Sequence, residues 1–264
     1  MPRFAANLTL MFTEHAFLDR FDAAAAAGFE AVEFLFPYAE TPDAVAARVE
    51  RNGLAVALFN MPPGDWENGE RGIAAIPGRD AELRDGVSRA IEYADALRAP
   101  LLHLMAGNAD PADADAWAAY REAVAFTAER LAEHGRALVL EPINKRDMPG
   151  YFLNDFRRAE ALVRELALPN LALQFDLYHR QILHGDVVSA LRASLDVIGH
   201  VQAASVPSRH EPDGEELNYP FVFAELDRLG YGGFVGCEYR PRAGTVEGLG
   251  WFEAWRPERA GSRG

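Results

Sequence analysis

The chain has only one cysteine, Cys237, and too few basic residues to balance its acidic ones, so its formal net charge is −14. A single cysteine excludes an internal disulfide. Because Cys237 stands within an apolar run with no base placed to activate it, we interpret it as a core residue rather than a nucleophile. No basic stripe is visible in the sequence, so we do not expect a nucleic-acid partner.

Long apolar segments are also missing. No uninterrupted apolar run approaches the roughly 18 residues of a membrane-spanning helix, and no charged segment followed by an apolar one marks a secretion signal. We therefore expect a cytoplasmic protein with no membrane partner, and the lone cysteine fits a reducing compartment. No glycine-rich fingerprint follows the first predicted strand, which argues against a dinucleotide-binding fold.

Short apolar strands alternate with helical patterns along the chain. We predict strands at residues 4–8, 31–34, 55–60, 101–104, 137–141, 171–176, 197–202 and 233–238, and helices at 15–27, 41–51, 77–97, 113–134, 154–165, 186–194 and 219–229. Thr41 and Asn154 are the predicted N-caps of two of these helices. The length of 264 residues lies close to the roughly 250 typical of a (β/α)8 TIM barrel. We therefore predict one α/β barrel domain over residues 1–264, although an open doubly wound sheet has the same local pattern.

A long polar excursion, residues 61–72, follows the third predicted strand. It exceeds the usual length of a connection between elements, which makes it a candidate functional loop. On length alone, a mobile insertion without a role explains it equally well.

Polar side chains end four successive predicted strands. The apolar run 138–140 stops at Glu141, with Pro142 directly after it, and the next three strands end at Asp176, Gln202 and Glu238. In a parallel barrel these ends meet at one face. Three carboxylates brought together repel one another unless a cation neutralises them, and an all-oxygen ligand set favours Mg²⁺ or Mn²⁺. The alternative is that each residue is a solvated strand terminus.

Possible substrate-binding groups surround these strand ends. His179 is expected on the loop that leaves the sixth strand, where it can bond a substrate hydroxyl or carbonyl oxygen. Arg209, on the loop after Gln202, suits a carboxylate. Lys145 and Arg71 are weaker candidates. Without the metal cluster, His179 would be interpreted as a surface residue and Arg209 as part of a loop ion pair.

Motifs along nearly the whole chain resemble the hydroxypyruvate isomerase family, which includes 2-oxotetronate isomerases and belongs to the xylose isomerase-like TIM barrel superfamily. They occupy residues 3–8, 28–34, 63–66 with 69–72, 141–144, 174–179 and 236–239. The resemblance implies a metal site formed by Glu141, Asp176, Gln202 and Glu238. It also implies that Glu141 and Glu238 act as the acid/base pair.

The reaction implied by the resemblance interconverts hydroxypyruvate and 2-hydroxy-3-oxopropanoate (tartronate semialdehyde) through an enediolate. Its substrate partner would be a small 2-oxo-3-hydroxy acid, and the sequence is compatible with a homo-oligomer. Three alternatives stay open: a 2-oxotetronate isomerase, a ketose 3-epimerase, and a non-catalytic binder of sugar acids. Related epimerases usually have histidine where this chain has Gln202, which favours an isomerase. Ser205 replaces an aspartate found in many relatives, so any role of that position is in doubt.

Overall fold

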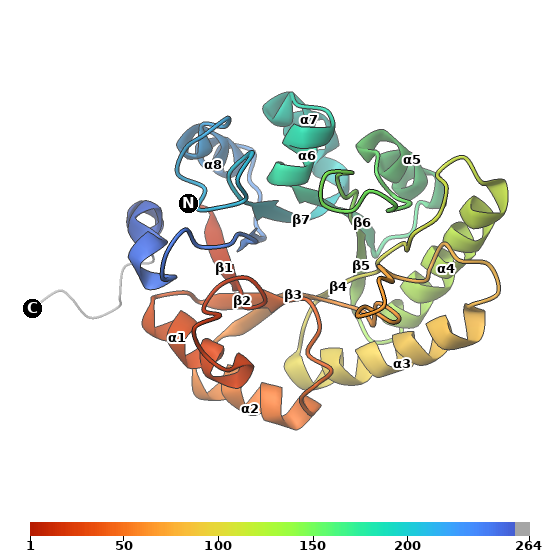
Figure 1. Cartoon of the computed structure of the whole chain (residues 1–264), viewed down its shortest axis with the longest axis horizontal. Helices are drawn as coiled ribbons and strands as arrows, with labels where there is room; N and C mark the ends of the chain where they lie inside the picture. The colour runs from red at the N-terminus through yellow and green to blue at the C-terminus, as the bar shows by residue number, and fades with distance from the viewer. Residues whose placement is uncertain (257–264) are drawn as a thin grey trace, which may run out of the picture.

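The computed structural model describes residues 1–256 as a closed barrel of parallel strands ordered β1 to β8, surrounded by helices (Figure 1). Strand β8 pairs with β1, which closes the barrel. This confirms the predicted (β/α)8 fold and excludes the alternative of an open sheet. The strands are β1 (Arg3–Asn7), β2 (Ala31–Phe34), β3 (Ala55–Asn60), β4 (Leu101–His103), β5 (Ala137–Leu140), β6 (Leu171–Asp176), β7 (Ile198–Ala203) and β8 (Phe234–Cys237).

The α-helices are α1 (Arg20–Ala26), α2 (Pro42–Arg51), α3 (Asp80–Leu97), α4 (Ala114–Ala132), α5 (Phe156–Leu166), α6 (Leu177–Leu183), α7 (Val187–Ser194) and α8 (Tyr219–Arg228). Short 3-10 helices are η1 (Phe17–Asp19), η2 (Leu195–Val197) and η3 (Val246–Trp255). Thr41 caps α2 as predicted, since its hydroxyl accepts a hydrogen bond from the Ala44 N–H. Asn154 was the wrong cap for α5, because the side chain of Asp155 accepts the first free N–H groups.

Helix α6 overturns the prediction of a loop after the sixth strand. The Asp176 Oδ1 atom accepts a hydrogen bond of 2.7 Å from the Tyr178 N–H, which lets the helix begin directly at the end of β6. His179 therefore stands in the first turn of a helix and not on a loop. This places its ring rigidly beside the strand ends.

The strands are buried on both faces, as expected where a parallel barrel is covered by helices. In β5, Leu138, Val139 and Leu140 are all fully buried. The inside of the barrel also holds a layer of buried polar side chains, namely Asn7, Glu33, Gln174, His200 and Gln202. Buried polar groups need partners, and these residues hydrogen-bond to one another.

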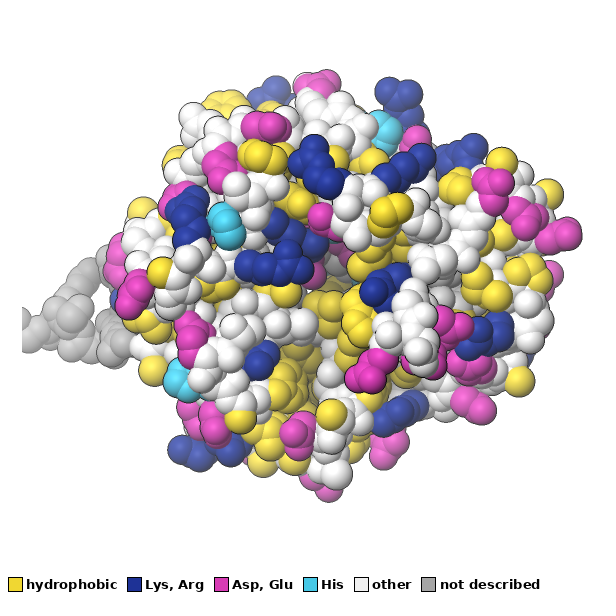
Figure 2. Space-filling model, in the orientation of Figure 1, with side chains coloured by type: hydrophobic (Ala, Val, Ile, Leu, Met, Phe, Trp, Pro, Cys, Tyr) yellow, Lys and Arg dark blue, Asp and Glu magenta, His cyan; other side chains and the backbone are white. Residues whose placement is uncertain are grey.

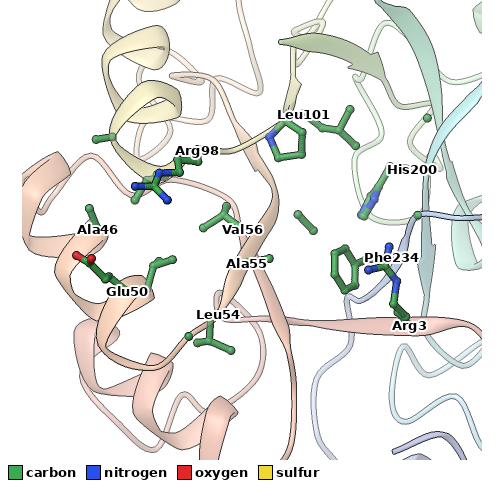
Figure 3. A pocket seen from close by; sticks show the side chains of 18 residues that line it. Arg3, Ala46, Glu50, Leu54, Ala55, Val56, Arg98, Leu101, His200 and Phe234 are labelled. Carbon is green, nitrogen blue, oxygen red and sulfur yellow. The ribbon is translucent and has the colours of Figure 1, made fainter. Parts of the chain in front are cut away.

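The amino-terminal end of the barrel is lined by small side chains. Ala5, Ala31 and Ala57 form a separate apolar cluster, and a cavity of about 710 Å³ opens at this end beside Phe234 and His200 (Figure 3). In TIM barrels this face contributes to stability, whereas the strands deliver functional groups at the opposite face. None of the helices within residues 1–256 has the length and apolar character needed to span a bilayer.

Candidate active site

Glu141 and Asp176 lie at the carboxyl ends of neighbouring strands and point toward the same histidine. The Nε2 atom of His179 is 3.7 Å from Glu141 Oε1 and 3.6 Å from Asp176 Oδ2. All three side chains are buried, and one ligand atom from each lies within 4.8 Å of the others. Figure 2 shows a hollow at the middle of the face in view, with acidic side chains inside it and basic ones around it.

The oxygen atoms of this group fit a divalent cation. Glu141 Oε1 and Asp176 Oδ2 are buried, and within residues 1–256 neither has a hydrogen-bond partner. Unpaired buried carboxylate oxygens are costly unless a cation or a proton compensates them. This buried group can therefore bind a metal ion.

Gln202, predicted as a third ligand, is oriented by two neighbours. Its Nε2 atom donates to Glu33 Oε1 at 2.8 Å, and its Oε1 atom accepts from Gln174 Nε2 at 2.6 Å. The carbonyl oxygen keeps a second lone pair for a cation. Glu33 is held in turn by Asn7 and His200. Gly236 leaves room for Glu33, because a Cβ atom there would lie 2.1 Å from Glu33 Oε2.

Glu238, just past β8, is paired with Arg209. The Nη2 atom of Arg209 lies 3.3 Å from Glu238 Oε2, and its Nη1 atom donates to Asp147 Oδ2 at 3.0 Å. The guanidinium also lies over the Tyr178 ring, 4.9 Å from its centre. Arg209 thus positions Glu238, and both ends of its planar fork are occupied by carboxylates.

Burial raises the pKa of three carboxyl groups at the strand ends. It raises the pKa of Glu238 to about 8 against the opposing charge of Arg209, and it raises the pKa of Asp176 to about 6. Burial, together with the charges of Glu238 and Asp176, raises the pKa of Glu141 well above its ordinary value. Burial also lowers the pKa of His179 well below 6.5. Near neutral pH and without a cation, Glu238 therefore retains its proton, while His179 is uncharged.

The remaining sequence candidates lie farther from this group or are already engaged. Lys145 is exposed on the turn after β5. Arg71 donates to the carbonyl oxygens of Trp66 and Glu70 within its own loop and stacks over the Trp66 ring at 4.0 Å. Ser205 accepts the His210 N–H at 3.0 Å, which braces the loop that carries Arg209.

Sequence reasoning missed several side chains around the site. Glu33 stands in the middle of an apolar strand, a placement that could have identified a buried acid. His103 at the end of β4 is fully buried, its Nδ1 lies 3.6 Å from Glu141 Oε2, and burial lowers its pKa to about 3. Asn144 and Asp147 contact His179 and Arg209 respectively, and only the folded chain brings these pairs together.

Comparison with known proteins places the chain in a family. Residues 21–255 match the model of the xylose isomerase-like TIM barrel. A 2-oxo-tetronate isomerase from Cupriavidus necator is 55% identical over 97% of this chain and 99% of its own length. The hydroxypyruvate isomerase of Escherichia coli K12 is 40% identical over 97% of this chain and all of its own length.

A solved structure from Brucella melitensis, described as an AP endonuclease of family 2, matches with a TM-score of 0.95 and 49% identity. It covers 97% of this chain and 100% of its own. The curated relatives confirm the predicted enzyme class, an isomerase. This chain belongs to the xylose isomerase-like TIM barrel family, in the branch that contains the hydroxypyruvate and 2-oxo-tetronate isomerases.

Proposed function

We propose that this protein interconverts 2-oxo-3-hydroxy acids and 2-hydroxy-3-oxo acids by moving a proton between C3 and C2. One observation carries the proposal: Glu141 belongs to the buried group that can bind a cation, and Glu238, also buried, lies close enough for its charge to raise the pKa of Glu141. Two neighbouring carboxyl groups with raised pKa values can each accept a proton from carbon and return it.

Glu141 and Glu238 form the proton-transfer pair in this proposal, without a separate role for each. One carboxylate removes the C3 proton, which produces an enediolate. A carboxylic acid of the pair then protonates C2 while the hydroxyl proton passes from O3 to O2, so that the carbonyl forms at C3 and the hydroxyl at C2. Arg209 holds Glu238 in place through its contact of 3.3 Å. The Nε2 atom of His179 faces the same space and bonds a substrate oxygen.

Glu141, Asp176, Gln202 and Glu238 would hold the metal ion, for which Mg²⁺ and Mn²⁺ suit the oxygen donors. When bound, the ion supplies Lewis-acid stabilisation of the charge that develops on the substrate oxygens. Glu33 and Gln174 contribute by holding the Gln202 amide with its oxygen available.

Two substrates share this chemistry. Hydroxypyruvate has three carbons and would yield 2-hydroxy-3-oxopropanoate, whereas 2-oxotetronate has four. The higher identity to the 2-oxo-tetronate isomerase supports the four-carbon acid ahead of hydroxypyruvate, which reverses the order expected from the motifs. Arg209 and Lys145 are the candidate partners of the substrate carboxylate. Because Arg209 already contacts the carboxylates of Asp147 and Glu238, we favour Lys145 as the partner.

An abasic-site endonuclease is the alternative raised by the Brucella structure. A net charge of −14 opposes binding to a phosphate backbone. Within residues 1–256, one buried group of three potential metal-binding side chains is found, with a single histidine. This donor set favours one hard cation rather than a cluster of zinc ions.

The test is a turnover assay of hydroxypyruvate and 2-oxotetronate with metal-stripped protein, to which Mg²⁺ or Mn²⁺ is added. We expect metal-dependent turnover of at least one acid. Glu238→Gln should lower kcat at least about 100-fold while the barrel stays folded. Glu92→Gln makes the same exchange on an exposed face of α3 and serves as the control. Near wild-type activity of Glu238→Gln would contradict the assignment.

A further inference from the structure

Asn144 is fully buried beside His179, and its side chain has no free hydrogen-bonding capacity. Its Oδ1 atom accepts the backbone N–H groups of Arg146 and Asp147 at 2.8 and 2.9 Å. Its Nδ2 atom lies 2.7 Å from His179 Nδ1 and donates to Asp147 Oδ2 at 3.2 Å. All partners of this amide therefore come from the turn after β5 and from α6.

These contacts permit only one orientation of the amide. A flipped side chain would set its NH₂ group against two backbone N–H donors and its oxygen against the Asp147 carboxylate. Nδ2 is consequently the atom that faces His179. The backbone N–H of Asn144 also donates to His179 Nδ1, at 3.3 Å.

Two donors aimed at one ring nitrogen require a lone pair there. We infer that Asn144 fixes the tautomer of His179, so that Nδ1 accepts and Nε2 carries the hydrogen that faces the active site. Asn144 is then a positioning residue that acts through His179. This inference rests on the proposed function only for its consequence in turnover, because the tautomer follows from the hydrogen bonds alone.

In this tautomer His179 is not a metal ligand. Nε2 lies within 3.7 Å of both carboxylates, so distance alone would include it in the group that can hold a cation. A nitrogen that carries hydrogen has no lone pair for a metal, and Nδ1 is occupied by Asn144. His179 instead presents an N–H donor to a substrate oxygen, and the metal is left to oxygen ligands.

The direct test is ¹⁵N NMR of metal-free protein labelled at histidine. The chain has seven histidines, and the signals of His179 are those that disappear in His179→Gln. We expect a pyrrole-type signal from Nε2 and a pyridine-type signal from Nδ1 at neutral pH. A hydrogen on Nδ1 in the wild-type protein would overturn the inference, and this readout needs neither substrate nor metal.

Asn144→Asp tests the amide itself, since it replaces the donor facing Nδ1 with an acceptor. We expect a hydrogen to appear on Nδ1 and kcat to fall about 10- to 100-fold, the range seen when a group that orients a functional residue is lost. Asn108→Asp, an exposed side chain on the loop after β4, is the control. An unchanged Nδ1 signal in Asn144→Asp would remove Asn144 from this role.

Metal affinity provides a second readout that separates this inference from the proposed reaction. His179→Gln should bind Mn²⁺ within about threefold of wild type, whereas Glu141→Gln should lose about 10- to 100-fold, as expected for a ligand. If His179→Gln lost as much as Glu141→Gln, His179 would belong to the metal ligands and the assigned tautomer would be wrong. The wild-type spectrum and this comparison decide the tautomer even where Asn144→Asp does not fold.

Discussion

Metal binding should release a proton, because Glu238, a predicted ligand, has a raised pKa and holds a proton near neutral pH when no cation is present. Burial raises the pKa of Glu238 to about 8 and that of Asp176 to about 6, and it raises the pKa of Glu141 as well. A carboxyl group must lose its proton before it can ligate a metal. Raising the pH from 6 to 8 should therefore strengthen Mn²⁺ binding about 100-fold, or about 2.7 kcal/mol, for each proton displaced throughout that range.

The metal-free protein should respond to pH in the opposite direction. Because the folded-state pKa of Glu238 is raised from 4.5 to about 8, the folded protein binds more protons than the unfolded chain between these values. Its free energy of unfolding must then fall as the pH rises through this window, by an amount on the order of 5 kcal/mol for Glu238 alone. Added metal should restore stability most strongly at the upper end.

Isothermal titration calorimetry with Mn²⁺ measures this linkage when it is performed from pH 6 to 8 in buffers of different ionisation enthalpy. Thermal unfolding at each pH, with and without metal, measures the stability change. Glu238→Gln should release about one proton fewer and flatten the pH dependence, whereas Glu92→Gln should match wild type. A Mn²⁺ affinity that stays constant within about twofold across this range would refute the reasoning.

Three further substitutions test the supporting contacts. Glu33→Gln weakens the acceptor that orients Gln202 and should lower Mn²⁺ affinity about 10- to 100-fold, measured by calorimetry; unchanged affinity would show that this layer does not support the metal. Gly236→Ala forces a methyl group against Glu33 and should cost about 1–3 kcal/mol in urea unfolding, where no loss would mean the site relaxes freely. Arg209→Lys cannot bridge Asp147 and Glu238, so it should lower kcat while the melting temperature changes little. An unaltered kcat would show that the contact between Arg209 and Glu238 is not needed for turnover.

The barrel could be predicted because its signals are local. Apolar runs such as residues 138–140 are short enough for buried strands, and the end of each run locates the carboxyl end of a strand. Strand ends converge in any parallel barrel, so Glu141 and Asp176 could be brought together without coordinates. Barrel closure itself was not available from local pattern and appears only in the pairing of β1 with β8.

The supporting contacts were beyond sequence reasoning because they join distant segments. Glu33 meets Gln202 across 169 positions in the chain, and Asn144 meets His179 across 35. Helix α6 was missed for a different reason. Asp176 was interpreted only as a strand-end acid, yet one of its oxygens also caps the helix that carries His179. The sequence pattern therefore indicated the role of Asp176 at the strand end but not its second role as the N-cap of α6.

The central claim is that this site moves a proton between C3 and C2 of a 2-oxo-3-hydroxy acid. The most direct measurement is ¹³C and ¹H NMR of 2-oxotetronate and of hydroxypyruvate incubated in D₂O with metal-loaded protein. We expect the carbonyl to move from C2 to C3. The deuterium content at C2 of the product then shows whether the transferred hydrogen exchanged with solvent. Deuterium entering at C3 while the carbonyl stays at C2 would indicate an epimerase, and no change in either acid with Mg²⁺ or Mn²⁺ would contradict the proposed reaction.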